Sequence, residues 1–399
     1  MKKVALSLVA ISVLSSAAFA ESVKYSGDAK LFYSAVNSGG VNYSDKENNL
    51  FDVAGSLKSE IKFDNSFNPV INWGLTAVSN LNSKKTKTWI THKKNDDGSA
   101  DENTTVDAIW LDTLNLTFNP FANTTMIIGR QKLDTPMVFS EEWNIASNSY
   151  DAVVLANTYF PKTTLVAAYV DKSNVGGAAT VNYLSQGRSF KDFGTKDGAY
   201  AFAIVNKSFC DTTLQAWYFN VVHLAKVAWL QADSKYMGID YGLQYANLNP
   251  DASGAKTGTA VAGKIGGSID GIALSAAYST VSDDGQNFVN VGGGQSKLYT
   301  DAWWNIGTVA QPNTKAYTLT ASYDFGIVNS SLYYTASKQS KSVANGIANE
   351  TKLNETTLTF DKSFGKLDTS FAFVNTQTKV DGVKQASDNE IQAYLTYHF

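Results

Sequence analysis

Three kinds of residue are scarce in this chain of 399 residues: cysteine, arginine and charged side chains in general. The single cysteine excludes a disulfide framework and any metal or iron–sulfur site built on several thiolates. Charged residues make up 17% of the chain, below the roughly 25% of an ordinary soluble domain. A formal net charge of −3 and a pI near 5.7 argue against a nucleic-acid-binding protein, because such proteins carry a basic stripe.

Long apolar runs are also missing. Beyond the N-terminus no stretch approaches the roughly 18 apolar residues of a spanning helix, and the mean hydropathy is only −0.18. Aromatic residues, in contrast, make up 12% of the chain, which is too rich in large apolar groups to be disordered. The composition predicts one large folded chain that is polar on average.

The first twenty residues have the features of a secretory signal peptide. Lys2 and Lys3 precede a short apolar stretch, and Ala18-Phe19-Ala20 forms a small-residue cleavage site. A membrane anchor is the alternative, but the apolar stretch is shorter than the roughly 20 residues that span a bilayer. We expect residues 1–20 to be removed before Glu21 and residues 21–399 to form one domain. That domain has 31 basic and 36 acidic residues, a net charge of −5.

Apolar and polar side chains alternate along most of the chain, which is the period of a β-strand with one apolar face. The last segment is the clearest: Ile391, Ala393, Leu395, Tyr397 and Phe399 alternate with Gln392, Tyr394, Thr396 and His398. The same alternation occurs in residues 51–63, 257–269, 317–323 and 367–373. A strand that ends the chain on an aromatic residue fits a membrane interface, where aromatic rings form girdles.

The connections between these segments alternate between short and long, as in a meander with tight turns at one rim and large loops at the other. We count about eighteen strands, with sixteen as the competing number. A soluble sandwich or β-helix would need a second apolar sheet or a fixed repeat, and neither is found. The predicted fold is an all-β, antiparallel up-and-down transmembrane barrel, closed because an open edge in lipid leaves backbone groups unpaired.

The third long loop, residues 133–149, has an unusual composition. It contains no glycine and one proline, but several large apolar residues, among them Met137, Val138, Phe139, Trp143 and Ile145. Such a loop needs protein to pack against, and in a barrel the available surface is the inner wall. We therefore predict that this loop folds inward.

Three segments resemble one family of porins: residues 129–136 (GRQKLDTP), 148–152 (NSYDA) and 161–170 (PKTTLVAAYV). They look like the OprD-like outer-membrane porins and the related major outer-membrane protein porins. The resemblance implies an eighteen-stranded barrel in a Gram-negative outer membrane, usually a homotrimer, with the third loop as a constriction. It also implies an arginine, here Arg130, on the strand before that loop. Some relatives carry calcium, but the resemblance assigns no calcium ligand in this chain. The chain departs from the substrate-specific relatives, which have a ladder of wall arginines, because it has only Arg130 and Arg188.

A pore sorts solutes by size and by the charges that line its narrowest part. Candidate constriction residues are Arg130, Lys132, Asp134, Glu141 and Glu142, with a surface location at the rim or loop tip as the alternative. Candidate wall residues are Lys58, Glu60, Lys62 and Lys264, and the first three could instead lie at the periplasmic rim. The pair Trp303-Trp304 could either pack a long loop over the pore mouth or extend a strand.

These observations favour a porin for passive diffusion of ions and small hydrophilic solutes, with a weak preference for cations. The alternatives are a channel selective for small organic acids or amino acids, and a barrel adhesin or surface antigen. We expect no enzyme, no cofactor and no metal, since the histidines His92, His223 and His398 are scattered and no catalytic grouping can be assigned. The expected partners are outer-membrane lipid and lipopolysaccharide, and no nucleic acid.

Overall fold

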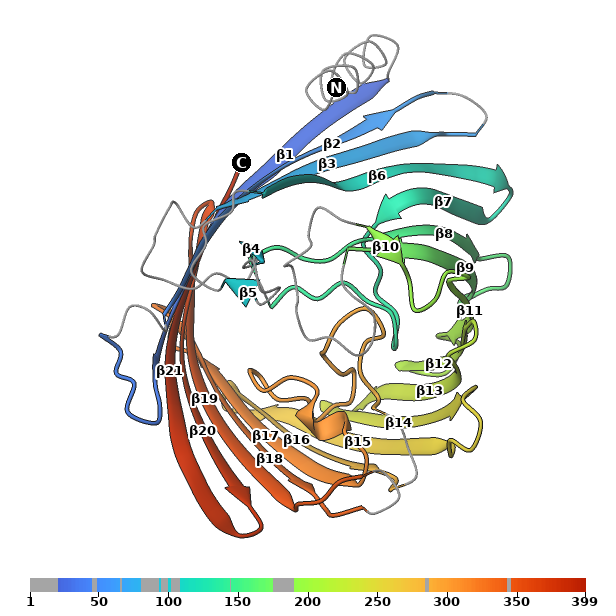
Figure 1. Ribbon diagram of the computed structural model, residues 1–399. Coiled ribbons are helices and arrows are strands. Elements are labelled where there is room, and N and C mark those ends of the chain that lie inside the picture. Colours follow the sequence, from blue (N-terminus) through green and yellow to red (C-terminus); the bar gives the residue numbers. More distant parts are fainter. Residues whose placement is uncertain are drawn as a thin grey trace.

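The computed structural model describes residues 21–44, 49–64, 67–79, 93–94, 100–101, 108–143, 145–174, 190–283, 287–342 and 346–399. The predicted signal peptide lies outside these residues, and so does Arg188. Within them the chain forms one large antiparallel sheet that curves into a ring (Figure 1). None of the helices in these ranges is long and apolar enough to cross a membrane.

Eighteen strands of the described residues form the wall of the barrel. They are β1 (Ser22–Asn37), β2 (Leu50–Lys62), β3 (Val70–Ser79), β6 (Ala108–Phe121), β7 (Thr124–Gln131), β8 (Tyr150–Asn157), β9 (Thr163–Ser173), β11 (Ala199–Asn206), β12 (Thr212–Val221), β13 (Ala225–Tyr236), β14 (Ile239–Pro250), β15 (Gly258–Ile269), β16 (Ile272–Val281), β17 (Thr314–Asp324), β18 (Asn329–Gln339), β19 (Thr351–Phe364), β20 (Leu367–Val380) and β21 (Val383–His398). The short strand β10 (Lys191–Asp192) adds to β9, β4 (Lys93–Lys94) pairs with β5 (Ala100–Asp101), and η2 (Thr308–Ala310) is a single helical turn.

The first and last strands close the barrel. Each wall strand pairs antiparallel with the next, and β1 pairs with β21 from Asp28 opposite His398 to Asn37 opposite Asn389. A closed ring leaves no strand edge unpaired, which is the condition for a sheet in hydrocarbon. The predicted antiparallel barrel and its eighteen strands are confirmed, and the competing count of sixteen is wrong.

Residues with a positive φ angle form the tight turns between neighbouring strands. Asp270 and Gly271 adopt φ angles of 50° and 82°, the left-handed pair of a two-residue hairpin turn between β15 and β16. The connection from β12 to β13 contains no Gly, Pro, Asn or Asp, yet it turns within residues 222–224. There His223 takes φ 61°, and Leu224 N donates to Val221 O at 2.9 Å. The chain therefore reverses between β12 and β13 without any of the usual turn residues.

The two faces of the wall differ as the alternation predicts. Large apolar side chains are exposed on the outside of every part of the barrel, among them Leu57, Leu243, Val261, Ile265, Leu319 and Phe371. Polar and charged residues occupy the alternate positions on several strands, such as Lys58 beside Leu57 and Lys264 beside Ile265. On β11 to β13 the alternate positions are instead buried apolar residues, among them Ala201, Phe219 and Val227. An apolar exterior with polar stretches on the interior fits a barrel that is surrounded by lipid and encloses water.

Two long loops enter the ring. They are loop 3 (residues 132–149), between β7 and β8, and loop 7 (residues 282–313), between β16 and β17, both visible inside the ring of strands (Figure 1). Buried apolar residues of both loops pack against small wall residues of β8 to β17; examples are Met137, Val291 and Leu298 against Ala201, Ala246 and Ala260. The predicted inward fold of loop 3 is confirmed, and loop 7 joins it there.

Candidate functional site

A tight turn shapes the tip of loop 3. Asp134 and Phe139 form an antiparallel bridge, and Ser140 N donates to Leu133 O at 2.7 Å. Across the turn, Thr135 Oγ1 donates to Val138 O at 2.6 Å. The turn directs Met137 and Val138 into the buried apolar cluster, where they are 1% and 3% exposed. The apolar residues that predicted inward packing are therefore the residues that hold the loop inside.

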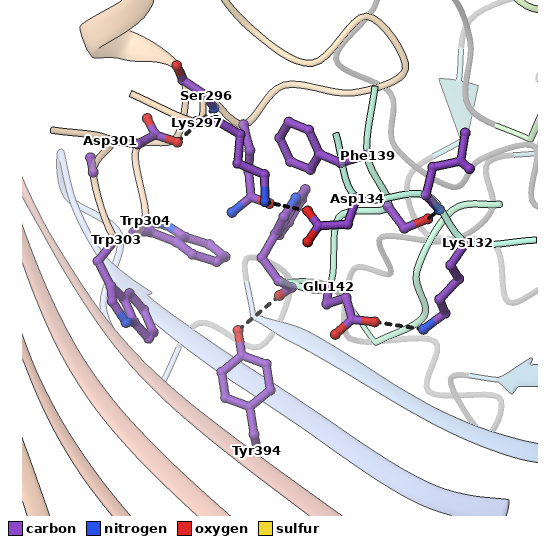
Figure 2. Close-up of a pocket in the computed structure, with 15 residues that line it drawn as sticks. Lys132, Asp134, Phe139, Glu142, Ser296, Lys297, Asp301, Trp303, Trp304 and Tyr394 are labelled. Atoms are coloured by element: carbon purple, nitrogen blue, oxygen red, sulfur yellow. Dashed lines mark hydrogen bonds and ion pairs between the residues drawn. The ribbon is translucent and has the colours of Figure 1, made fainter. Parts of the chain in front are cut away.

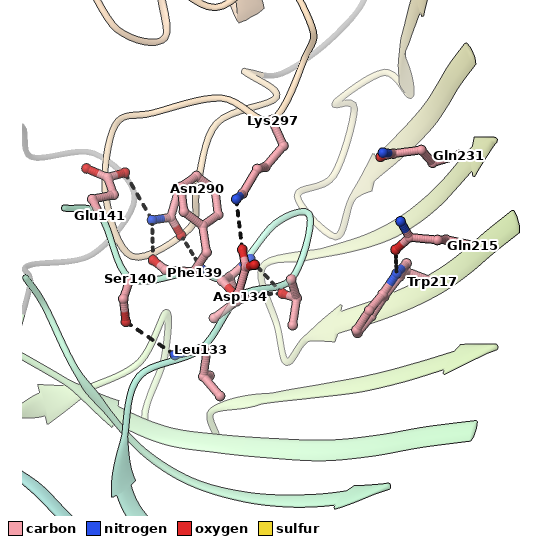
Figure 3. A network of polar contacts seen from close by, with 12 residues as sticks. Leu133, Asp134, Phe139, Ser140, Glu141, Gln215, Trp217, Gln231, Asn290 and Lys297 are labelled. Carbon is pink, nitrogen blue, oxygen red and sulfur yellow. Dashed lines mark hydrogen bonds and ion pairs between the residues drawn. The ribbon is translucent and has the colours of Figure 1, made fainter. Parts of the chain in front are cut away.

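Asn290 of loop 7 binds the backbone of loop 3. Its side-chain Nδ2 donates to Phe139 O at 2.7 Å, and its Oδ1 accepts a hydrogen bond from Phe139 N at 3.2 Å. Val291 N also donates to Met137 O at 2.8 Å. Figure 3 shows Asn290 between Phe139 and Glu141. The two loops are thus hydrogen-bonded to each other inside the barrel, although they are distant in sequence.

Glu141 completes this junction, which we call the loop 3–loop 7 clasp (Glu141 with Asn290, Gly294 and Gln295). One carboxylate oxygen accepts hydrogen bonds from Asn290 Nδ2 at 3.0 Å, Gly294 N at 2.7 Å and Gln295 N at 2.8 Å. The other accepts from Trp143 Nε1 at 2.9 Å. Because Glu141 is only 5% exposed, its charge holds loop 7 rather than facing a channel. This placement differs from the expectation that Glu141 lines the constriction.

Loop 7 is also attached to the opposite wall. Glu355 of β19 accepts hydrogen bonds from Trp304 N at 3.0 Å and Asn305 N at 2.7 Å. On β13 and β14, Asp233 accepts from Tyr299 Oη at 2.8 Å, and Gln244 Nε2 donates to Lys297 O at 2.8 Å. Loop 7 therefore crosses the lumen between walls that lie far apart along the chain.

The sequence does contain a signal for loop 7, although the prediction concerned only loop 3. Loop 7 has the same excess of apolar residues, including Phe288, Val291, Leu298 and Val309, all of them buried. Trp303 and Trp304 belong to this segment. The two tryptophans do not extend a strand. They pack a long loop, as one of the two alternatives predicted, but the loop lies inside the barrel and not over its mouth.

Loops 3 and 7 and the wall strand β21 enclose a cavity of about 910 Å³. Charged side chains from both loops line it: Lys132, Asp134 and Glu142 from loop 3, and Lys297 and Asp301 from loop 7. Figure 2 shows these side chains around the cavity, with Tyr394 of β21 on the wall below Glu142. The structure thus brings three of the five candidate constriction residues together and adds Lys297, which sequence reasoning missed.

Four of these five side chains form two ion pairs. Lys132 Nζ lies 2.7 Å from Glu142 Oε1, and Lys297 Nζ lies 2.8 Å from Asp134 Oδ1. The carboxylate is the more exposed partner in both, with side-chain exposures of 69% for Glu142 and 83% for Asp134 against 39% and 40% for the lysines. The hydrogen bond from Lys132 lowers the pKa of Glu142, and the charges of Lys30 and Lys58 lower it further. Glu142 therefore carries its charge at neutral pH.

Arg130 lies in the wall beside the cavity but does not line it. Its guanidinium binds Asp151 through two hydrogen bonds, of 2.7 and 3.0 Å, and donates to Leu111 O at 2.9 Å. The same guanidinium stacks 3.2 Å from the ring centre of Phe190. All of these contacts join β6, β7 and β8 to the end of the loop that follows β9. Arg130 thus connects strands and a loop. The sequence alone predicts it in the constriction.

The candidate wall residues occupy different levels of the barrel. Lys58 lies near Asp28, at 3.8 Å, and close enough to Glu142 to affect its pKa. Glu60 pairs with Lys62 at 3.4 Å, and Lys62 ends β2 at the short-turn rim. Lys264 pairs with Asp233 at 2.8 Å on the far wall. Of the four, Lys58 is close to Glu142, and Lys264 contacts loop 7 through Tyr299, whose ring centre lies 4.2 Å from Lys264 Nζ.

One further carboxylate lies within loop 7. Asp301 accepts hydrogen bonds from Ser296 N at 2.9 Å and Gly307 N at 2.7 Å, which fold the loop on itself. Burial raises the pKa of Asp301 to about 7, and the nearby charge of Glu141 acts in the same direction. In the part of the chain that the structure describes, no three His, Cys, Asp or Glu side chains are grouped to hold a metal ion.

Solved structures with the same architecture are outer-membrane channels. Pseudomonas aeruginosa OccK8 (OprE) is 14% identical, has a TM-score of 0.72, and the match covers 96% of this chain and 99% of that one. Acinetobacter baumannii OccAB3 is 13% identical with a TM-score of 0.75, covering 94% and 99%. Pseudomonas aeruginosa OpdK, solved with vanillate, is 12% identical with a TM-score of 0.71, covering 96% and 99%. The chain has the fold of OprD-family channels.

No protein-family model and no curated protein sequence matches the chain. Identities of 12–14% to the solved channels establish the fold. At that level they confirm the resemblance predicted from residues 129–136, 148–152 and 161–170. They also confirm the predicted type of barrel, that of Gram-negative outer-membrane channels.

Proposed function

We propose that this protein is an outer-membrane channel for passive diffusion of ions and small hydrophilic solutes. The observation that carries the proposal is the closed barrel in which two inward loops and the wall leave a cavity of about 910 Å³ lined by charged side chains. Charged groups on facing surfaces of a water-filled path are the usual means by which a pore selects solutes. The shared fold with OccK8 and OccAB3 supports this function.

Within the proposal, Lys132, Asp134, Glu142 and Lys297 form the constriction, and Lys58 contributes to the facing wall. Glu141 and Arg130 position the loops and strands around it. A channel needs no catalysis, and we propose no enzymatic activity. Removal of residues 1–20, a homotrimeric assembly and contact with lipopolysaccharide remain proposals that rest on the sequence and its resemblance.

A weak cation preference belongs to the same proposal. In each ion pair of the cavity the carboxylate side chain is more exposed than the lysine side chain. The exposed fractions are 69% for Glu142 against 39% for Lys132, and 83% for Asp134 against 40% for Lys297. A mobile cation therefore meets the negative ends first. The paired lysines keep the preference small, because a neighbouring opposite charge cancels most of the field at a distance in water.

A substrate-selective channel is the second candidate, because loop 7 crosses the lumen and leaves a defined cavity in place of a wide opening. Swelling of liposomes that contain the purified protein would test both. A passive channel predicts swelling rates that fall smoothly with solute size. Rates that depend on solute chemistry at equal size would favour the selective channel, and no swelling with a folded barrel would refute both.

The cation preference has a separate test with a matched control. Glu142→Gln should lower the ratio of cation to anion permeability, measured as the zero-current potential across a salt gradient. Glu350→Gln makes the same chemical change in the loop between β18 and β19, where Glu350 pairs with Lys338 and Lys352, and should leave the ratio unchanged. If the permeability ratio is the same in both variants and in the unmodified protein, Glu142 does not line the constriction.

A further inference from the structure

The cavity between loops 3 and 7 has an aromatic surface that a simple water-filled pore does not need. The rings of Trp143 and Trp304 lie edge to face, with centres 6.0 Å apart and planes at 84°. Trp303 continues this surface, 6.4 Å from Trp304 and tilted by 36°. All three line the cavity together with Tyr394, whose hydroxyl donates to Trp143 O at 3.4 Å (Figure 2). Three tryptophan rings from two loops thus form a continuous surface, and Tyr394 of the wall lines the same cavity.

These rings keep part of their surface unburied. Trp143, Trp303, Trp304 and Tyr394 are each only partly buried, so ring surface is left at the cavity. Apolar surface in contact with water is unfavourable, by about 25 cal/mol for each Å². A solute that covers the rings recovers this free energy, and aromatic faces favour flat or ring-shaped apolar surfaces.

Four of the five charged side chains that line the cavity form neutral pairs, and the fifth, Asp301, is hydrogen-bonded to Ser296 N and Gly307 N. Lys132 is paired with Glu142, and Lys297 with Asp134, at hydrogen-bonding distance. Each pair leaves N–H groups and carboxylate oxygens with unused hydrogen-bonding capacity, because an ammonium has three donors and a carboxylate about four acceptor sites. An uncharged solute with many hydroxyl groups can use both kinds of group, whereas an ionic solute meets one attractive and one repulsive charge in each pair.

We propose that the cavity is a binding site for neutral pyranose sugars on their way through the channel. A pyranose has an apolar face of C–H groups, which lies on the tryptophan surface, and a rim of hydroxyls, which bind the two ion pairs. The cavity volume of about 910 Å³ lies in the range of roughly 300–1,000 Å³ of pockets that enclose a small molecule. The proposal rests on the proposed channel, because the sugar reaches the site through the pore.

Planar-bilayer recordings with glucose and sorbitol test the proposal. Sorbitol has the same six carbons and similar polarity but no ring, so it controls for viscosity and for excluded volume. Glucose should reduce the single-channel current in a saturable way, and sorbitol should reduce it only as much as it lowers the conductivity of the bulk solution. A planar aromatic acid such as benzoate is the third solute, and a stronger block by benzoate than by glucose would overturn the assignment to sugars.

Variants locate the site. Trp303→Ala should raise the half-blocking glucose concentration by roughly fivefold to tenfold, the loss expected for one stacking ring. Trp303→Phe keeps a ring and should retain most of the block, and Tyr236→Ala, which removes an exposed aromatic ring at the end of β13, should have no effect.

The outcomes separate the two proposals. An open, ohmic channel in which glucose and sorbitol act alike refutes the sugar site and leaves the channel intact. A saturable glucose block that Trp303→Ala does not change refutes the aromatic surface as its cause. No current from a folded barrel refutes the channel itself.

Discussion

The loop 3–loop 7 clasp predicts a large effect from one buried carboxylate. Glu141→Ala removes the acceptor of two loop 7 backbone N–H groups, at 2.7 and 2.8 Å, and of the Asn290 side chain at 3.0 Å. Hydrogen bonds to a charged group contribute about 1.5–3 kcal/mol each, and some of this returns when the freed groups reach water. We therefore expect the free energy that holds loop 7 against loop 3 to fall by about 3 kcal/mol. The population of the form in which loop 7 is detached should then rise roughly a hundredfold.

The barrel itself should stay folded, because its strand pairing does not include loop 7. Trypsin cleavage after Lys297 measures the released form, since cleavage follows the population of the open state when opening and closing are fast. Mass spectrometry of the fragments would give the rate. We expect cleavage of Glu141→Ala roughly 100 times faster than that of the unmodified protein, together with larger and noisier single-channel currents.

The adjacent carboxylate provides the matched control. Glu142→Gln changes the next residue, whose side chain is exposed in the cavity and makes no contact with loop 7 backbone in the described residues. Cleavage after Lys297 should therefore remain slow. Gly293→Ala offers an independent disruption, because a Cβ at Gly293 would lie 2.1 Å from Glu141 Oε1. If Glu141→Ala and the unmodified protein are cleaved at the same rate, the clasp does not hold loop 7 and this reasoning is refuted.

Three further predictions concern charges. Because Lys132 lowers the pKa of Glu142, a protein in which Asp301→Asn removes the other titrating carboxylate of the cavity should keep a constant cation preference from pH 7 to pH 5 and lose it only at lower pH, as followed by zero-current potentials; a decline already at pH 6 would contradict this expectation. Since the native pKa of Asp301 is raised to about 7, the native state binds this proton more tightly than the unfolded chain, and stability should rise from pH 8 to pH 6. Asp301→Asn should remove that part of the pH dependence of the thermal midpoint, and an unchanged slope would disprove it. Arg130→Lys cannot make both bonds to Asp151 and should lower stability by about 2 kcal/mol, seen as a lower temperature of heat-modified gel migration; an unchanged temperature would show that the pair contributes little.

The sequence predicted the strands well because one physical constraint acts on all of them. Lipid outside requires apolar side chains on the outer face of the wall strands, and on strands such as β2 and β21 polar side chains alternate with them. The apolar residues of loop 3 predicted its inward fold for the same reason: Met137 and Val138 must be covered. Loop 7 satisfies the same criterion through Phe288, Val291 and Leu298, so its position could have been predicted as well.

The roles of individual charges could not be predicted in the same way. Glu141 and Glu142 are adjacent and chemically identical, yet Glu141 is buried in the clasp and Glu142 is exposed in the cavity. The difference depends on the backbone N–H of Gly294, which lies 153 positions further along the chain. Lys297 lies opposite Asp134 for a similar reason, 163 positions away. No local pattern reports contacts at such separations, because they arise only when the barrel has closed.

The most direct test of the channel is the current through the purified protein in a planar bilayer. We expect stepwise insertions of fixed size, a current linear in voltage, and a zero-current potential in a salt gradient that lies slightly toward the equilibrium potential of the cation. If the protein shows heat-modifiable migration on a gel, and is therefore a folded barrel, but gives no steps, loops 3 and 7 do not leave an open path.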